Sequence, residues 1–223
     1  MDILGLWTKT CREVGARDDI AGAGARLVAA YGSPTRRYHD LRHLADVLHH
    51  LDLLAADPRT GLRDEQLAAV RLAAWFHDAV YDTPTPDNPA PDNEERSAEL
   101  TATELAQLRV PTTTIAEVQR LVRLTRLHDA GPADQAGAAL CDADLAVLAR
   151  DPAGYAEYTA AIRAEYADVP NELFRPGRAA VLQSLLDLPT LFRTPYGAEH
   201  WQARAVANLS AELIDLTRPP PPR

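Results

Sequence analysis

The amino-acid sequence predicts an all-α protein, and three observations support this fold class. Residues that favour helices dominate the chain. No stretch alternates β-branched and polar residues over enough positions to predict a strand. Prolines fall between the expected helices, because a proline in a helix interior removes a backbone hydrogen bond. At 223 residues, the chain can bury a full core and fits one large domain better than two.

Helices are expected, in chain order, over residues 3–15, 19–31, 40–56, 64–79, 93–108, 112–127, 141–149, 152–166, 175–187 and 198–216. Their boundaries are marked by Gly32-Ser33-Pro34, Asp57-Pro58, Pro111, Gly131-Pro132, Asp151-Pro152, Pro170 and Pro195. The clearest inward stripes are Leu44, Leu48 and Leu51 in helix 40–56, Val70, Ala73 and Ala74 in helix 64–79, and Ile115, Val118, Leu121 and Val122 in helix 112–127. A single helical domain is therefore expected over residues 1–216, followed by a frayed, proline-rich tail over residues 217–223.

Composition and charge narrow the class of protein. Hydrophobic residues make up 46% of the chain and charged residues 25%, as in soluble globular proteins. The sequence shows neither an apolar run of the roughly 18 residues that span a membrane nor an export signal, so a cytoplasmic location is expected. A net charge of −9 opposes binding to a nucleic-acid polymer but allows a small anionic substrate in a local positive pocket.

Two familiar kinds of site are excluded by pattern. Cys11 and Cys141 are the only cysteines and lie far apart without CxxC spacing, which suits a reducing compartment and excludes a cysteine-built zinc knuckle. Both are expected to be packing residues. The sequence also lacks the GxxxxGK[ST] pattern, which excludes a P-loop nucleotide site.

Three His-Asp dipeptides occur in the chain, and their contexts differ. His39-Asp40 opens a helix within a polar run, and His128-Asp129 closes one, where a histidine is often only a partner of the helix dipole. Only His77-Asp78 ends a core-like apolar run. An inward histidine followed by an aspartate is costly unless something binds both side chains. The alternative is a core histidine that bonds to the backbone.

Two further side chains complete a candidate metal site. His43 lies on the flank of the apolar stripe in helix 40–56. Asp144 shares a face with Leu140 and Leu148, so it is expected to point inward, whereas Asp142 can serve as a cap. Together these residues give the order His43, His77-Asp78 and Asp144 on three separate helices. Two imidazoles and two carboxylates suit Mn, Fe, Co, Ni, Zn or Mg.

At this point the chain resembles the HD superfamily of metal-dependent phosphohydrolases. The resemblance extends beyond the ligands to Arg37-Tyr38-His39, Trp75-Phe76-His77-Asp78, Asn93-Glu94-Glu95, Thr125, His128, Asp142-Ala143-Asp144-Leu145, Tyr158, Arg163, Glu165-Tyr166, Arg178, Arg204 and Asn208, as in an uncharacterised bacterial branch. It implies a helical bundle in which His43, His77, Asp78 and Asp144 surround one divalent ion. It also implies hydrolysis of a phosphoester or phosphoanhydride by a metal-activated water.

Catalytic roles are carried over to three acids. In related enzymes an acidic residue near the dipeptide activates the attacking water, which points to Glu94 or Glu95, with Asp78 acting at the ion. Glu94 and Glu95 also begin a helix, so a purely structural interaction with the helix dipole is the alternative. The loop over residues 83–92, which precedes them, could be a lid or an ordinary surface connection.

Substrate contacts are expected from cationic and imidazole side chains. The candidates are Arg37, His39, His128, Arg163 and Arg178, with Arg204 as a weaker one. His39 and His128 could instead belong to a second metal site. Each arginine has a plain alternative in a surface or interhelix salt bridge, and Tyr158 and Tyr166 could be core residues.

The expected function is hydrolysis of a small phosphorylated metabolite, with a nucleotide as the leading substrate class. The alternative is a nucleotide-binding or regulatory module that retains the metal site but turns over weakly. A homodimer is also compatible with the sequence.

Overall fold

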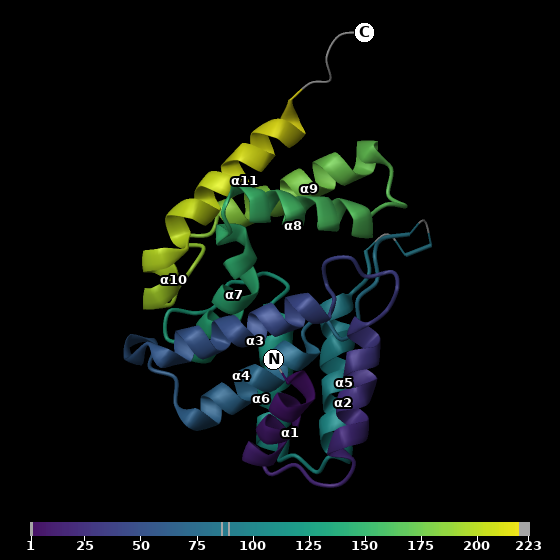
Figure 1. Ribbon diagram of the computed structural model, residues 1–223, viewed down its shortest axis with the longest axis vertical. Helices are drawn as coiled ribbons and strands as arrows, with labels where there is room; N and C mark the ends of the chain where they lie inside the picture. Colours follow the sequence, from purple (N-terminus) through teal and green to yellow (C-terminus); the bar gives the residue numbers. More distant parts are fainter. Residues whose placement is uncertain (1, 86, 89, 219–223) are drawn as a thin grey trace.

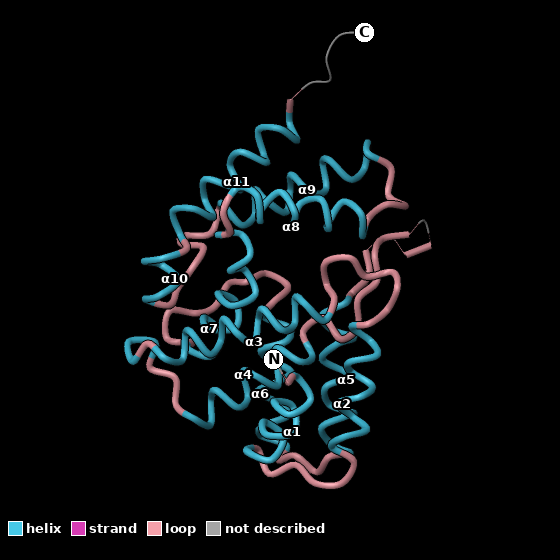
Figure 2. The backbone as a smooth tube through the Cα atoms, viewed as in Figure 1, coloured by secondary structure: helices cyan, strands magenta, loops and turns pink. Residues whose placement is uncertain are grey.

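The structure is a computed structural model, which describes residues 2–85, 87–88 and 90–218. All regular structure within these residues is helical, and the helices are joined by loops (Figure 2). The elements are α1 (Ile3–Glu13), α2 (Ile20–Tyr31), α3 (Leu41–Ala56), η1 (Pro58–Thr60), α4 (Asp64–Phe76), α5 (Asn93–Gln107), α6 (Thr112–Leu124), α7 (Gln135–Leu145), η2 (Ala146–Ala149), α8 (Pro152–Glu165), α9 (Asn171–Leu186), α10 (Pro195–His200) and α11 (Gln202–Thr217). The all-α prediction is confirmed.

The first core lies among α1 to α7. Trp7, Trp75 and Phe76 are fully buried at its centre, and the ring of Trp7 meets those of Trp75 and Phe76 edge to face at 5.2 and 6.0 Å. The apolar end of α4 is therefore packed firmly against α1. This matters for function because α4 ends at Phe76, directly before His77.

A second core lies among η2, α8, α9 and α11. Leu182, Phe192 and Leu209 are fully buried within it. Figure 1 shows α8, α9 and α11 together at one end of the molecule and α1 to α6 at the other, with α7 between them. Since α7 carries Asp144, the carboxylate lies where the two groups of helices meet.

Several helix boundaries differ from those expected. Gln135 starts α7 six residues before the predicted start, because the side chain of Asp134 accepts the Gly137 amide and caps the helix. The predicted helix 64–79 ends at Phe76. Helix 175–187 starts at Asn171 and continues through Pro176.

Two predictions concern the end of the chain. The predicted helix 198–216 is divided at Trp201 into α10 and α11, because Thr194 caps a separate short helix that begins at Pro195. The expected frayed tail falls mostly on residues 219–223, which lie outside the described part of the chain. No helix in the described residues is long and apolar enough to cross a lipid bilayer.

Candidate metal centre

The end of α4 fixes the orientation of His77. The backbone amide of His77 still donates to the Ala73 carbonyl at 2.8 Å, so this residue, the C-cap of α4, keeps a helical conformation. Its ring nitrogen Nδ1 lies 2.8 Å from the carbonyl oxygen of Ala74. A carbonyl only accepts, so Nδ1 carries the proton and donates. In the neutral ring, Nε2 is then left with a free lone pair, as metal coordination requires.

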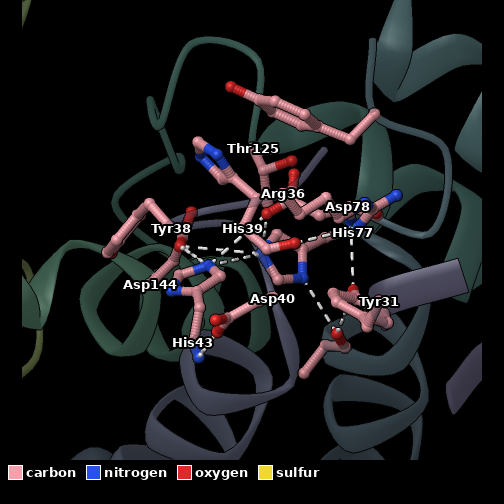
Figure 3. Close-up of polar contacts among 12 residues, drawn as sticks. Tyr31, Arg36, Tyr38, His39, Asp40, His43, His77, Asp78, Thr125 and Asp144 are labelled. Atoms are coloured by element: carbon pink, nitrogen blue, oxygen red, sulfur yellow. Dashed lines mark hydrogen bonds and ion pairs between the residues drawn. The ribbon is translucent and has the colours of Figure 1, made fainter. Parts of the chain in front are cut away.

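Ligand atoms of His43 and Asp144 converge on this nitrogen from two other helices. His43 from α3 places its Nε2 3.2 Å from Nε2 of His77. Asp144 from α7 places Oδ1 3.1 Å from the His43 nitrogen and 3.6 Å from the His77 nitrogen. The ligand atoms of these three residues all lie within 4.8 Å of one another, and Figure 3 shows the side chains pointing toward a common centre.

Asp78 reaches the same centre. Its Oδ2 lies 2.9 Å from Nε2 of His77 and 3.4 Å from Nε2 of His43. His43, His77-Asp78 and Asp144 are separated in the sequence but lie together in the structure. Two imidazole nitrogens and two carboxylates form a donor set that suits a divalent ion of the first transition row.

Burial of the cluster makes it costly to leave a charged group without a partner of opposite charge. His43 and His77 are only 5% and 2% exposed. Burial favours the neutral imidazole, but hydrogen bonds to Asp144 and Asp78 outweigh it and raise the pKa of His43 to about 9. For His77 the same opposition, with the charge of Asp78 as the main favourable contribution, raises the pKa well above its ordinary value.

The two carboxylates respond in the opposite direction. Burial alone would raise the pKa of Asp78 and Asp144, yet the charge of His77 and hydrogen bonds from the histidines hold both well below the usual value. Four inward-facing groups with two anionic charges thus need positive charge between them, which either protons or a metal ion can supply. Among these residues, His43, His77 and Asp144 offer ligand atoms close enough together to hold a metal ion.

Arg36 holds the turn at His77-Asp78, a role that the sequence alone does not predict. Its guanidinium donates to the carbonyl oxygens of Asp78 at 2.6 Å, His39 at 3.0 Å and Ala79 at 3.0 Å. The side chain is buried among these groups. Arg36 therefore ties the segment before α3 to the turn that follows α4, and so fixes the two ligand-bearing segments relative to each other.

Glu165 holds the segment around His39, a role that the sequence motif does not predict. Its Oε2 accepts the backbone amides of Arg37, Tyr38 and His39 at 2.7, 3.0 and 3.1 Å. Its Oε1 contacts Nδ1 of His39. Burial raises the pKa of Glu165, but these hydrogen bonds, led by that from His39, lower it to about 2. The carboxylate thus orients His39, whose ring also stacks on Tyr81 with centroids 3.9 Å apart.

His128 adjoins the cluster through Asp144. Its Nε2 lies 2.8 Å from Oδ2 of Asp144, while the other oxygen of that carboxylate faces His43 and His77. His128 adopts a left-handed backbone conformation with φ of 52°, which is unusual for a residue other than glycine. Both predicted histidines outside the ligand set, His39 and His128, therefore lie beside the candidate metal centre.

The two candidate acids occupy different environments. Glu95 forms a bidentate pair with Arg123 on α6, with nitrogen to oxygen distances of 2.7 and 2.6 Å. Glu94 instead lines a cavity of about 340 Å³ together with His77, Asp78 and Asp144. Ala90 and Pro91 from the loop over residues 83–92 line the same cavity. Of the two glutamates, Glu94 is the one that lines the cavity beside the cluster.

The predicted arginine contacts are only partly brought to the site. Arg37 is exposed and offers its backbone amide to Glu165. Arg163 donates to the carbonyls of Tyr166 and Val169 at the end of α8, and lines a different cavity. Arg178 pairs with Glu212 at 2.8 and 3.1 Å and lies 5.2 Å from the ring centre of Tyr158. Arg204 lies 3.4 Å from the Ala149 carbonyl.

The prediction that Asp142 serves as a cap of its own helix is wrong. Asp142 is fully buried and accepts the backbone amides of Arg193 at 2.9 Å and Thr194 at 2.8 Å, together with the Thr194 hydroxyl at 2.6 Å. Burial raises its pKa to about 6. The residue anchors the segment before α10 to α7, whereas Asp134 caps α7.

A larger cavity of about 1180 Å³ continues from the same region toward α8 and α9. Both cavities share His39, Glu94, His128 and Asp144 in their linings. No protein-family model, curated protein or solved structure matched the chain. The established content of the site is therefore a His43, His77 and Asp144 cluster that could hold a metal ion in an all-α fold, and the HD resemblance stays a prediction.

Proposed function

We propose that this protein is a metal-dependent phosphohydrolase that cleaves a phosphoester or phosphoanhydride of a small metabolite. The observation that carries the proposal is the convergence of His43, His77, Asp78 and Asp144 from three separated segments into one buried cluster. A purely structural role explains this poorly, since buried histidines and carboxylates stabilise a fold less well than apolar residues of similar size. The resemblance to HD phosphohydrolases rests on the same residues.

A divalent ion held by these four residues would supply a Lewis acid and lower the pKa of a bound water. The chain's own groups then account for the remaining requirements. Glu94 lines the smaller cavity together with cluster residues and would accept a proton from the nucleophile. His39 and His128 lie on the wall of both cavities and would hold the oxygens of a phosphate.

The orientation of His39 and His77 supports this assignment of roles. His39 directs Nδ1 to the carboxylate of Glu165, so its other nitrogen is free to interact with a substrate. His77 directs Nδ1 to a backbone carbonyl, so its Nε2 serves the cluster. Both rings are thus held through Nδ1, which leaves Nε2 of each ring for other contacts.

The test combines metal analysis of purified protein with a phosphate-release screen over nucleotides and other phosphoesters in several divalent metals. About one transition-metal ion per chain and metal-dependent release are expected. Asp78→Ala should lose the ion, because the change removes both a ligand and a charge. Full metal retention by that variant contradicts the site, and metal binding without release from any phosphoester favours a nucleotide-responsive regulatory module instead.

A further inference from the structure

One face of α9 is apolar and exposed. Leu173 and Val181 are 66% and 50% exposed, and Gly177 lies between them at helical spacing. The opposite side of the helix carries Leu182, which is fully buried in the second core. The helix is therefore already anchored, and its apolar outer stripe is left exposed by the residues that the structure describes.

This stripe is a wall of the larger cavity. Leu173, Gly177 and Val181 all line the 1180 Å³ space. Leu127, which is 71% exposed, lines it as well. Three of the six large hydrophobic side chains that are exposed in the described chain thus gather around one hollow. Such a gathering of exposed apolar side chains is typical of a ligand site.

The polar side chains on the α8 and α9 part of the wall are already engaged. Arg178 forms its bidentate pair with Glu212, and the hydroxyl of Ser184 donates to the Val181 carbonyl at 2.8 Å. Asp168 adds one carboxylate to the lining between the two helices, and the rest of this wall is apolar or aromatic, as at Ile162 and Phe174. A sugar with several hydroxyl groups would find few free partners there, whereas an apolar group would bury its surface.

The same cavity reaches the candidate metal centre. Asp144, His39 and His128 form its polar end, and the α9 stripe lies on another part of its lining. A single ligand can therefore have its charged group at the cluster and its organic group against α9. The volume exceeds what a phosphate alone requires and suits a bulky substituent.

We infer that the substrate is a phosphoester of a bulky apolar or aromatic alcohol, with the organic group bound in the cavity beside α9. This inference rests on the proposed function for the phosphate end and narrows the substrate class beyond it. It favours an apolar organic group over the ribose and base of a nucleotide.

Gly177 offers a direct test. A Cβ atom built at this residue meets no other atom within 4 Å, so a side chain can be added without a clash. Gly177→Leu should fill the cavity from the wall, whereas Gly177→Ala adds only a methyl group and serves as the matched control. Both changes should favour the helix, because glycine is a poor helix former. Thermal unfolding followed by circular dichroism checks that both variants are folded.

The probes are non-hydrolysable methyl-, hexyl-, decyl- and naphthylphosphonate, with uridine monophosphate for comparison, titrated calorimetrically into the Mn²⁺-loaded full chain. Affinity should rise by at least about tenfold from hexyl- to decylphosphonate, because each buried methylene contributes to binding. Gly177→Leu should lose this rise and Gly177→Ala should keep it. Preference for decyl- over naphthylphosphonate indicates a lipid-like alcohol, and the reverse indicates an aromatic one.

Two results overturn the inference: affinity that does not change with chain length, or tighter binding of uridine monophosphate than of naphthylphosphonate. Asp144→Asn separates the inference from the proposed function. If both hold, this variant should weaken all phosphonates by a common factor while their dependence on chain length persists. If the wild type shows that dependence without metal binding or phosphate release, the apolar site stands and the proposed function fails.

Discussion

Raising the pH should destabilise the metal-free protein between pH 6.5 and 9. The pKa of His43 is about 9 in the fold against 6.5 ordinarily, so the folded state binds a proton more tightly than the unfolded chain. A group with a raised pKa stabilises the fold fully below the unfolded value, and this stabilisation is lost as the pH rises through the folded value. At about 1.4 kcal/mol per pKa unit, the loss is roughly 3 kcal/mol.

Other titrating groups change the stability mainly outside the range from pH 6.5 to 9. Asp142 has its pKa raised from 3.8 to about 6, so its contribution is lost between those values. Glu165 has its pKa lowered from 4.5 to about 2, so its contribution is lost only on acidification. Burial raises the pKa of Cys11 from 9.0 to about 12, which affects stability above the window. His77 changes in the same direction as His43 and adds to the effect.

The assay is urea denaturation with a chelator present, followed by tryptophan fluorescence because Trp7 and Trp75 are fully buried. The free energy of unfolding should fall across the window at a constant m value. His43→Gln removes one titrating ring and should show a shallower slope. A free energy that stays level from pH 6.5 to 9, or a slope unchanged in His43→Gln, refutes the reasoning. With saturating Mn²⁺ the decline should flatten, because metal binding requires the deprotonated rings.

Three further predictions concern individual side chains. Elemental analysis should show that Asp144→Asn loses bound metal, whereas Asp142→Asn should keep it. Asp142→Asn should instead lower the free energy of unfolding by about 1–3 kcal/mol, because hydrogen bonds are lost. The opposite pattern would mean that the two carboxylates have been assigned the wrong roles. Arg36→Lys should cost about 2–4 kcal/mol and weaken metal binding, since an ammonium cannot reproduce the planar fork to three carbonyls; unchanged urea midpoints and metal content would contradict this. Glu94→Gln should lower kcat by roughly 10²–10⁴-fold with metal retained, while Glu95→Gln should change kcat little, and equal effects of both would remove the assignment of Glu94.

The ligand cluster could be predicted because its signals are local. His77 and Asp144 each interrupt an apolar stretch, and a polar side chain on a core face is costly unless it has a partner. The structure brings their ligand atoms together with that of His43. Helix existence was predictable for the same reason, since periodic apolar residues report directly on a buried face.

The supporting residues could not be predicted because their signals are not local. Arg36 and Arg37 are adjacent and chemically identical, yet the first is buried among three carbonyls and the second is exposed. Only the packed structure distinguishes them. Glu165 lies far along the chain from the His39 amide it accepts. The start of α7 was missed because a small, glycine-containing stretch predicts a loop, whereas the Asp134 cap and burial of Ala136 and Ala139 stabilise a helix.

Asp144 connects the candidate metal centre with the cavity. Its Oδ1 faces His43 and His77, and its Oδ2 accepts a hydrogen bond from Nε2 of His128 on the cavity wall. The pKa of Asp144 is held well below its usual value, since the charge of His77 and hydrogen bonds from His128 and His43 outweigh burial. An ionised carboxylate only accepts hydrogen bonds, so Nε2 of His128 must be the donor. A ligand bound at the cluster would therefore also change the charge of the Asp144 carboxylate that holds His128. A phosphate entering from the cavity would meet the cluster and His128 together.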